Sequence, residues 1–140
     1  LDLNAPLIFH AERAFGPSQN DPKEFESKLM PGHLSLYGIA RAIAFSATAH
    51  AAILKISRGF DPNRNCGWVV LGLRLRTLKP IPLNFPISCT TWVAATDGAR
   101  LIREYELHTG SESLAFATQD FVLFDRESRR AMLPPKAARE

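Results

Sequence analysis

Three side chains able to move a proton lie close together in the sequence, around a Pro-Gly turn. His33 directly follows Gly32, Tyr37 comes about one helical turn later, and Glu26 precedes the turn. Histidine titrates near neutral pH and can act as a general base. Backbone N–H groups at a helix N-terminus stabilise negative charge that develops on a carbonyl oxygen. We therefore predict a site in which Gly32 helps to polarise a carbonyl. His33, Tyr37 and Glu26, in that order of preference, are the candidates to assist an attacking water.

The same residues also have structural interpretations, which the sequence leaves open. Gly32 can simply form the turn before a helix, and His33 can be a surface or capping histidine. Tyr37 can pack with its hydroxyl at the edge of the core. His50, on an apolar helix face, is more typical of a hydrogen-bonded core histidine than of a catalyst.

The two cysteines, Cys66 and Cys89, show neither a C-x-x-C pattern nor a Cys/His metal spacing. A nucleophilic Cys66 would need a lowered pKa and a neighbouring base, and the sequence around it supplies neither. We therefore expect two reduced thiols, no metal site, no redox cofactor and a cytoplasmic protein. No signal peptide is recognisable at the N-terminus.

The size and composition favour one domain. With 140 residues, 46% of them hydrophobic, the chain can bury a core. We expect a single domain over 1–140, with 1–6 and 126–140 as peripheral tails. The formal net charge is +3, with many arginines in the C-terminal half. These arginines can be solvated strand faces or a docking surface for an acidic partner. Nucleic acid is disfavoured because no basic run alternates with aromatic residues.

The longest helical pattern, residues 32–56, would position the candidate residues. Leu36 and Ile39 begin a recurrence of apolar residues at helical spacing, small alanines fill the other faces, and Ser35 is a suitable N-cap. A helix that is apolar on all sides is either buried or in a membrane. Because Arg41 and several polar residues interrupt the run, we predict a buried helix and no membrane span.

Alternating apolar and polar residues predict strands on both sides of this helix. The expected strands are residues 7–15, 68–78, 87–95, 100–108 and 113–124, with a hairpin turn at Asp97-Gly98. One face of the second strand is expected to carry Val69, Leu71, Leu73 and Leu75. The layout is α+β, an antiparallel sheet wrapped around one long central helix. A single sheet covers only part of such a helix, so we expect a partner subunit that extends the sheet.

Several local strings occur in a fixed order along the chain. They are Gly32-His33-Leu34-Ser35-Leu36, His50 near the helix end, Trp68-Val69-Val70-Leu71 leading to Arg76, Thr91-Trp92, Arg103-Glu104-Tyr105, and Asp125 to Arg130 followed by Leu133-Pro134. Over about residues 30–135 this order resembles the acyl-ACP thioesterase family of the hot-dog fold. The resemblance implies a homodimer or higher hot-dog oligomer that hydrolyses acyl thioesters of acyl carrier protein or coenzyme A in fatty-acid or polyketide metabolism.

The resemblance also implies where substrate would bind. Asn65 lies in a loop that hot-dog folds bring near the acyl tunnel, and Trp68 can line that tunnel. Together with Gly32 and His50, these two residues are the expected substrate-binding set. The chain departs from the family pattern at its carboxylates, because no acid lies between Ser27 and Asp61. A non-hydrolytic hot-dog protein therefore stays open: a dehydratase, an acyl-transfer or tailoring enzyme, or an acyl-binding module without catalysis.

Overall fold

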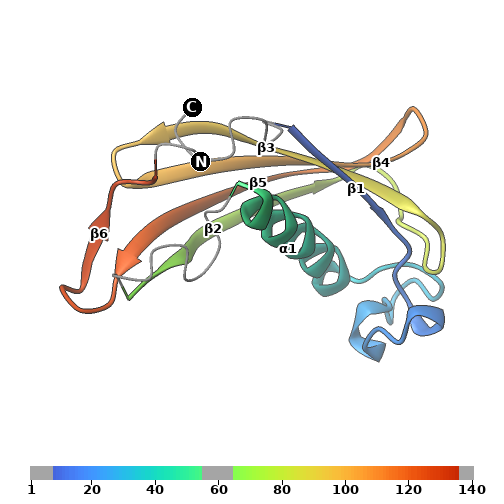
Figure 1. The fold of residues 1–140 in the computed structure, drawn as a ribbon. Coiled ribbons are helices and arrows are strands. Elements are labelled where there is room, and N and C mark those ends of the chain that lie inside the picture. Colours follow the sequence, from blue (N-terminus) through green and yellow to red (C-terminus); the bar gives the residue numbers. More distant parts are fainter. Residues whose placement is uncertain (1–7, 55–64, 136–140) are drawn as a thin grey trace.

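A curled antiparallel sheet of six strands packs its concave side against one long helix (Figure 1). The computed structural model describes residues 8–54 and 65–135. The elements are β1 (Ile8–Arg13), the 3₁₀ turns η1 (Pro17–Gln19) and η2 (Lys23–Phe25), α1 (Leu36–Ile53), β2 (Cys66–Thr77), β3 (Ile87–Asp97), β4 (Arg100–Thr109), β5 (Glu112–Asp125) and β6 (Arg130–Met132). The predicted α+β layout is confirmed. The last two residues of the predicted helix, the first of the first predicted strand, and 1–6 and 136–140 lie outside the described residues.

The strand order in the sheet is β1-β3-β4-β5-β2, so β2 forms one edge although it directly follows the helix in sequence. Strands β3, β4 and β5 form an antiparallel meander, and β2 joins it by pairing with β5. Asp97 pairs with Arg100 across a two-residue turn in which Gly98 has a φ of +57°, so the predicted hairpin is confirmed. The short strand β6 forms within the segment predicted to be a tail, and it pairs with the end of β5.

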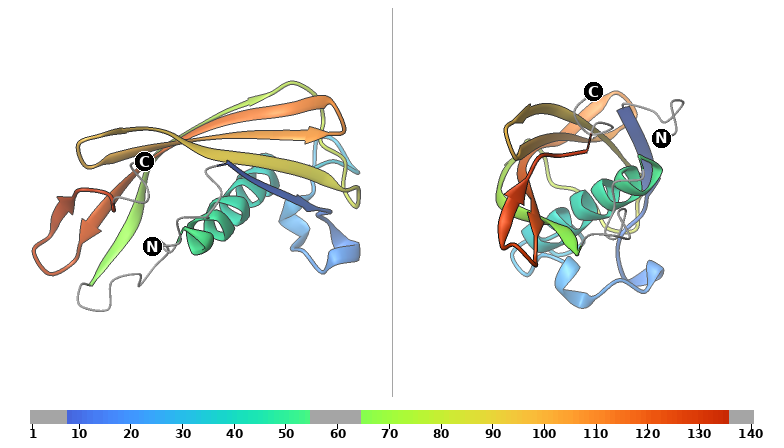
Figure 2. Two further views of the ribbon diagram at one scale, coloured as in Figure 1. Left: turned by 45° about the horizontal axis from the view of Figure 1, so that its top comes forward. Right: turned by 60° about the vertical axis from the view of Figure 1, so that its left-hand side comes forward.

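Helix α1 lies against the concave side of the sheet, as both turned views show (Figure 2). Its N-cap is Ser35, whose Oγ accepts the N–H of Gly38 at 3.0 Å, as the sequence predicted. A side chain at Gly38 would meet the Phe25 carbonyl oxygen at 2.7 Å, so only glycine allows η2 to pack this closely on the helix. The helix contacts β3, η2 and β1. These contacts leave the β2 side of the sheet less covered.

The helix is only partly enclosed. Its buried face carries Gly38, Ile39, Ala42, Ile43, Ser46 and His50. On its other side, Leu36 is 70% exposed and Phe45 is 50% exposed. By length and composition alone, α1 would also suit a membrane-crossing helix, although the core helix of a soluble protein passes the same test. Its packing on β1 and β3 is that of a core helix.

Strand β2 differs from the sequence prediction. The register against β5 shifts between Val70 and Gly72, which marks a bulge. Beyond this bulge the faces change phase, so Val69 lies on the opposite face from Leu73 and Leu75. The prediction of one shared apolar face is therefore wrong. Most of the apolar side chains of β2 are exposed, and these are Val69, Val70, Leu71 and Leu73.

Candidate functional site

The chain entering α1 folds into a tight loop around Gly32. Glu26 and Leu34 form an isolated antiparallel bridge, and the Ser27 N–H donates to the His33 carbonyl at 2.8 Å. The Glu26 carboxylate accepts the Gly32 N–H at 2.8 Å. Gly32 has a φ of +81°, a conformation that favours glycine. The fold therefore brings the predicted acid, Glu26, onto the predicted glycine turn.

His33 is held in a defined orientation beside this turn. Its ring Nδ1 lies 3.2 Å from the Pro31 carbonyl oxygen. A carbonyl oxygen can only accept, so Nδ1 carries the proton in this contact. In the neutral ring, Nε2 is then the unprotonated nitrogen. His33 is half-buried, and a second isolated bridge joins its backbone to Pro82. The arrangement leaves Nε2 as the atom able to accept a proton.

The Gly32 N–H is not a vacant donor, because the Glu26 carboxylate already occupies it. A substrate carbonyl could use this N–H only by displacing Glu26. The first turn of α1 still presents the positive end of the helix dipole at this site. Within that turn, the Gly38 N–H is taken by the Ser35 cap.

Tyr37 lies on the outer side of α1 and is 53% exposed. Its ring packs edge-to-face on Phe25, with ring centroids 5.6 Å apart. It also lines a surface groove with Arg13 and Arg41. Tyr37 is therefore near the same end of the helix as His33, although its ring is turned toward this groove.

His50 lies at the other end of the helix, about 20 Å along the axis from Tyr37 at 1.5 Å per residue. Its side chain is fully buried and its ring stacks on Phe9, with centroids 5.5 Å apart. The Arg103 guanidinium donates to His50 Nδ1 at 2.7 Å. Because a guanidinium can only donate, His50 accepts at this atom and its ring is neutral. These contacts are those of a hydrogen-bonded core histidine.

Asn65 and Trp68 also lie away from the His33 loop. The Asn65 carbonyl accepts the Arg126 N–H at 2.9 Å, and its exposed side chain lies 3.5 Å from that guanidinium. Trp68 packs edge-to-face on Phe121, with centroids 6.4 Å apart, in the apolar cluster that includes Leu54 near the end of α1. The predicted residues thus divide into two groups, one at each end of the helix. Glu26, Gly32, His33 and Tyr37 form the first, and His50 and Trp68 form the second, whereas Asn65 lies against Arg126 at the end of β5.

The sequence analysis missed a buried polar cluster in the middle of the sheet. Arg103 is 3% exposed and hydrogen-bonds to Thr91 as well as to His50, the Thr91 contact being 3.3 Å. Burial lowers the pKa of Arg103, and burial raises the pKa of Cys89 to about 11. Burial raises the pKa of Tyr105 as well, and its hydroxyl donates to Gln119 at 2.6 Å. The alternation of β4 could have indicated that Arg103 is buried, because Arg103 lies on the same strand face as the buried Tyr105.

Both cysteines are free and buried, in agreement with two reduced thiols. The raised pKa of Cys89 keeps this thiol neutral near pH 7, so it is not an activated nucleophile. Among the described residues, no group of three or more His, Cys, Asp or Glu side chains could hold a metal ion.

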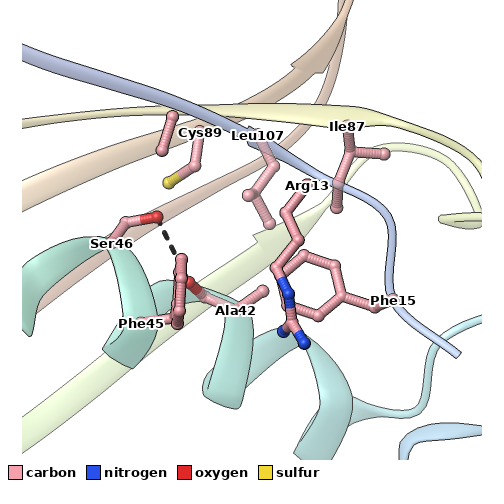
Figure 3. Close-up of a pocket in the computed structure, with 9 residues that line it drawn as sticks. Arg13, Phe15, Ala42, Phe45, Ser46, Ile87, Cys89 and Leu107 are labelled. Atoms are coloured by element: carbon pink, nitrogen blue, oxygen red, sulfur yellow. Dashed lines mark hydrogen bonds between the residues drawn. The ribbon is translucent and has the colours of Figure 1, made fainter. Parts of the chain in front are cut away.

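A small pocket runs between α1 and the strands that cover it (Figure 3). Phe45 is the half-exposed residue of its lining, and Phe15, Ser46 and Cys89 are buried. The Ser46 hydroxyl donates to the Ala42 carbonyl at 3.3 Å, so its hydrogen is already used within the helix. The remaining lining is mostly aliphatic and aromatic. Its cavity volume is only about 10 Å³, so in this structure the pocket is too small to hold an acyl chain.

The comparison with protein-family models identifies the chain. Residues 30–137 match the model of the acyl-ACP thioesterase N-terminal domain. The chain belongs to the acyl-ACP thioesterase family. The resemblance stated from the sequence is therefore confirmed, and the match begins just before the Gly32 turn. No curated protein sequence matches the chain.

Solved structures of acyl-ACP thioesterases share this fold. An acyl-ACP thioesterase from Bacteroides thetaiotaomicron is 15% identical with a TM-score of 0.77; the match covers 90% of this chain and 49% of that one. A 12:0-ACP thioesterase from Umbellularia californica is 17% identical with a TM-score of 0.72, covering 93% of this chain and 50% of that one. A 1,4-dihydroxy-2-naphthoyl-CoA thioesterase from Synechocystis is 11% identical with a TM-score of 0.76, covering 93% and 91%. The hot-dog fold predicted from the sequence is confirmed.

The chain spans about half the length of the two acyl-ACP thioesterases just described, but most of the length of the naphthoyl-CoA thioesterase. The family model that matches is likewise that of one domain. In these two acyl-ACP thioesterases, the fold seen here accounts for about half of the chain.

Proposed function

We propose that this chain takes part in the hydrolysis of acyl thioesters carried by acyl carrier protein or coenzyme A. Membership of the acyl-ACP thioesterase family supports this reaction class. The contact between His33 Nδ1 and the Pro31 carbonyl is the observation on which we assign the reactive groups to this end of α1. It leaves Nε2 of His33 ready to accept a proton beside the N-terminus of α1.

In this proposal the His33 Nε2 removes a proton from water, and the water oxygen attacks the thioester carbonyl carbon. The positive end of α1 stabilises the negative charge that develops on the carbonyl oxygen. The carbon–sulfur bond then breaks, and the departing thiolate receives the proton held by His33. The products are a carboxylic acid and the free thiol of the carrier. Glu26 is a positioning residue that fixes the Gly32 turn, and Tyr37 is close enough in sequence to meet substrate at the same end.

The apolar edge strand β2 supports a partner that extends the sheet. Strand β2 has no neighbour on one side among the described strands, and Leu71 is 57% exposed there. An exposed apolar edge strand is a template for pairing with another strand. We propose that a second hot-dog unit pairs along β2, either another copy of this chain in a homodimer or higher oligomer, or a second domain. We also propose that the chain is part of a soluble cytoplasmic protein that acts in fatty-acid or polyketide metabolism.

A specific observation also favours an acyl-binding role without hydrolysis in this unit. Helix α1 carries no carboxylate, and the Gly32 N–H is already bonded to Glu26. If the reactive groups lie on the second hot-dog unit, this unit would hold the acyl chain and contribute no base. His33 variants would then leave turnover unchanged.

Release of free thiol distinguishes these two roles. The full-length protein is tested on acyl-ACP and acyl-CoA substrates of several chain lengths, beside His33→Gln and Glu26→Gln. The matched control is His10→Gln, which alters an exposed histidine on β1. We expect His33→Gln to lower kcat at least about 100-fold, the usual contribution of a general base. Unchanged turnover in His33→Gln would assign the reaction to another part of the protein.

A further inference from the structure

A surface groove beside α1 combines two arginines with exposed aromatic rings. One wall is a stripe of the helix, in which Tyr37, Arg41 and Phe45 follow at intervals of four residues and so share one face. The opposite wall includes Arg13 of β1 and Asp21, which follows η1. The groove therefore lies where the first strand, the η1–η2 segment and the helix meet.

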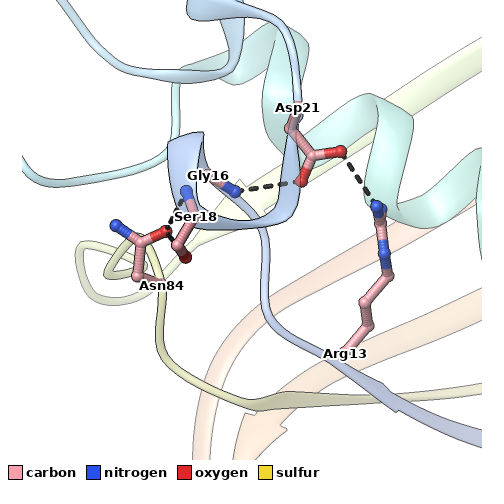
Figure 4. A network of polar contacts seen from close by, with 5 residues as sticks. All are labelled: Arg13, Gly16, Ser18, Asp21 and Asn84. Carbon is pink, nitrogen blue, oxygen red and sulfur yellow. Dashed lines mark hydrogen bonds and ion pairs between the residues drawn. The ribbon is translucent and has the colours of Figure 1, made fainter.

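Hydrogen bonds hold the Asp21 side of this groove in place (Figure 4). The Asp21 carboxylate accepts Arg13 Nη2 and the Gly16 N–H, each at 2.9 Å. Its side chain is only 8% exposed. Gly16 has a φ of +141°, and a side chain there would meet Asn84 Oδ1 at 2.5 Å, so the loop packs closely on the Asn84 turn. Among the described residues that line the groove, Asp21 is the only carboxylate, and it is already engaged.

The positive charge of the groove exceeds its negative charge. Arg13 is paired with Asp21, and its guanidinium lies over the Phe45 ring at 5.1 Å from the centroid. Arg41 is exposed and forms no ion pair with any residue that the structure describes. One full positive charge thus stays uncompensated between Tyr37 and Phe45, which are both about half exposed. A planar guanidinium with several donors suits a phosphate oxygen well.

The groove lies next to the small apolar pocket of Figure 3, since Arg13, Phe15 and Phe45 line both. Tyr37 connects the same groove to the helix end that carries His33. A ligand held here would thus lie on the outer face of α1, toward the end that carries His33.

We propose that this groove binds the phosphate group of a phosphopantetheine arm, with Arg41 as its main cationic contact. The proposal rests on the thioester function proposed above, since coenzyme A and a loaded acyl carrier protein both present this phosphate. Arg13 supports the site by orienting the Phe45 ring, and the aromatic rings of Tyr37 and Phe45 pack on the arm. The phosphate is the shared feature, and the two carriers are its two sources.

The test is calorimetric binding of 4′-phosphopantetheine and pantetheine, which differ only in the phosphate, to the full-length protein. We expect the phosphate to improve binding about tenfold, the usual size of one charge-assisted contact at an accessible site. Arg41→Gln should abolish this gain and Arg41→Lys should keep part of it. Raised salt should weaken phosphopantetheine binding more than pantetheine binding.

The matched control is Arg130→Gln, which removes an exposed arginine of β6 at the opposite end of the molecule from η1 and η2 (Figure 2). Circular dichroism confirms that each variant is folded. Equal affinity for phosphopantetheine and pantetheine would overturn the proposal. So would an Arg41→Gln variant that binds as Arg130→Gln does.

Two further titrations identify the source of the phosphate. If Arg41→Gln weakens binding of coenzyme A, the site accepts the nucleotide carrier; if it weakens binding of holo- but not apo-acyl carrier protein, the site accepts the protein-bound arm. Either result supports the proposal. If Arg41→Gln weakens the binding of neither carrier, the proposal is wrong. These readouts need no turnover. Thiol release with no phosphate effect contradicts this inference alone, whereas phosphate-dependent binding without thiol release contradicts the hydrolase proposal alone.

Discussion

Replacing His50 by leucine tests the buried polar cluster most sharply. In the folded protein the Arg103 guanidinium is buried and donates to His50 Nδ1 at 2.7 Å and to Thr91 Oγ1 at 3.3 Å. Leucine is similar in size to histidine but cannot accept a hydrogen bond. The substitution therefore removes the shorter of the two contacts and leaves the charge in a low-dielectric interior. A hydrogen bond to a charged group is worth about 2 kcal/mol, so we expect a loss of that order in the free energy of unfolding.

A second substitution separates the lost hydrogen bond from general damage to the core. Arg103→Met removes the buried charge while keeping much of the apolar length of the side chain. Replacing buried charged groups by apolar ones is often neutral or stabilising. The double variant His50→Leu/Arg103→Met should therefore recover about half of the stability lost in His50→Leu.

Urea unfolding followed by circular dichroism measures these differences, and thermal unfolding provides a second scale. A loss of about 2 kcal/mol corresponds to a fall of about 6 °C in Tm for a domain of this size. The reasoning would be refuted if His50→Leu cost less than about 0.5 kcal/mol, or if the double variant were no more stable than His50→Leu.

Three other predictions follow from single features. Ser35→Ala removes the N-cap of α1 and should lower the free energy of unfolding by about 1 kcal/mol in urea titrations, with Ser111→Ala, an exposed turn position, as a control expected to change little. The Cys89 thiol ionises at a lower pH in the unfolded chain than in the folded protein, where burial raises its pKa to about 11. The stability that the neutral folded thiol contributes is therefore complete below pH 9.0 and is lost as the pH rises to about 11. Cys89→Val should therefore show a shallower alkaline loss of stability in unfolding titrations across that window. Leu71→Lys places a charge on the exposed edge β2 and should weaken pairing with a second hot-dog unit, seen as a smaller mass in sedimentation if the partner is another copy, whereas Leu29→Lys should not.

Local patterns sufficed for much of the fold. The apolar spacing of α1 and its Ser35 cap are interactions between near neighbours in sequence, so they can be read directly. The same holds for the β3–β4 hairpin, whose turn needs a positive φ at Gly98. The hydrogen bond between Glu26 and the Gly32 N–H also joins residues only six positions apart, so the sequence could indicate Glu26 as a candidate for this loop.

Features that depend on partners far along the chain were not visible in the sequence. The bulge of β2 arises in its pairing with β5, so simple alternation assigned Val69 to the wrong face. The burial of Arg103 depends on Thr91 and His50, which lie on two other elements. The length of α1 places His50 far from His33, so two histidines on one predicted helix could not belong to one compact site. The groove lined by Arg13 and Arg41 lies between β1 and α1, and no local sequence pattern indicated it.

The most direct test of thioester hydrolysis is the mass of the acid released in water enriched with heavy oxygen. The full-length protein is incubated with an acyl-ACP or acyl-CoA substrate, and the products are examined by mass spectrometry. We predict a free acid that carries one heavy oxygen atom, formed together with one equivalent of free thiol, because water supplies the attacking oxygen. A folded protein that retains a bound acyl group but releases no labelled acid from any substrate would contradict hydrolysis and leave acyl binding as its role.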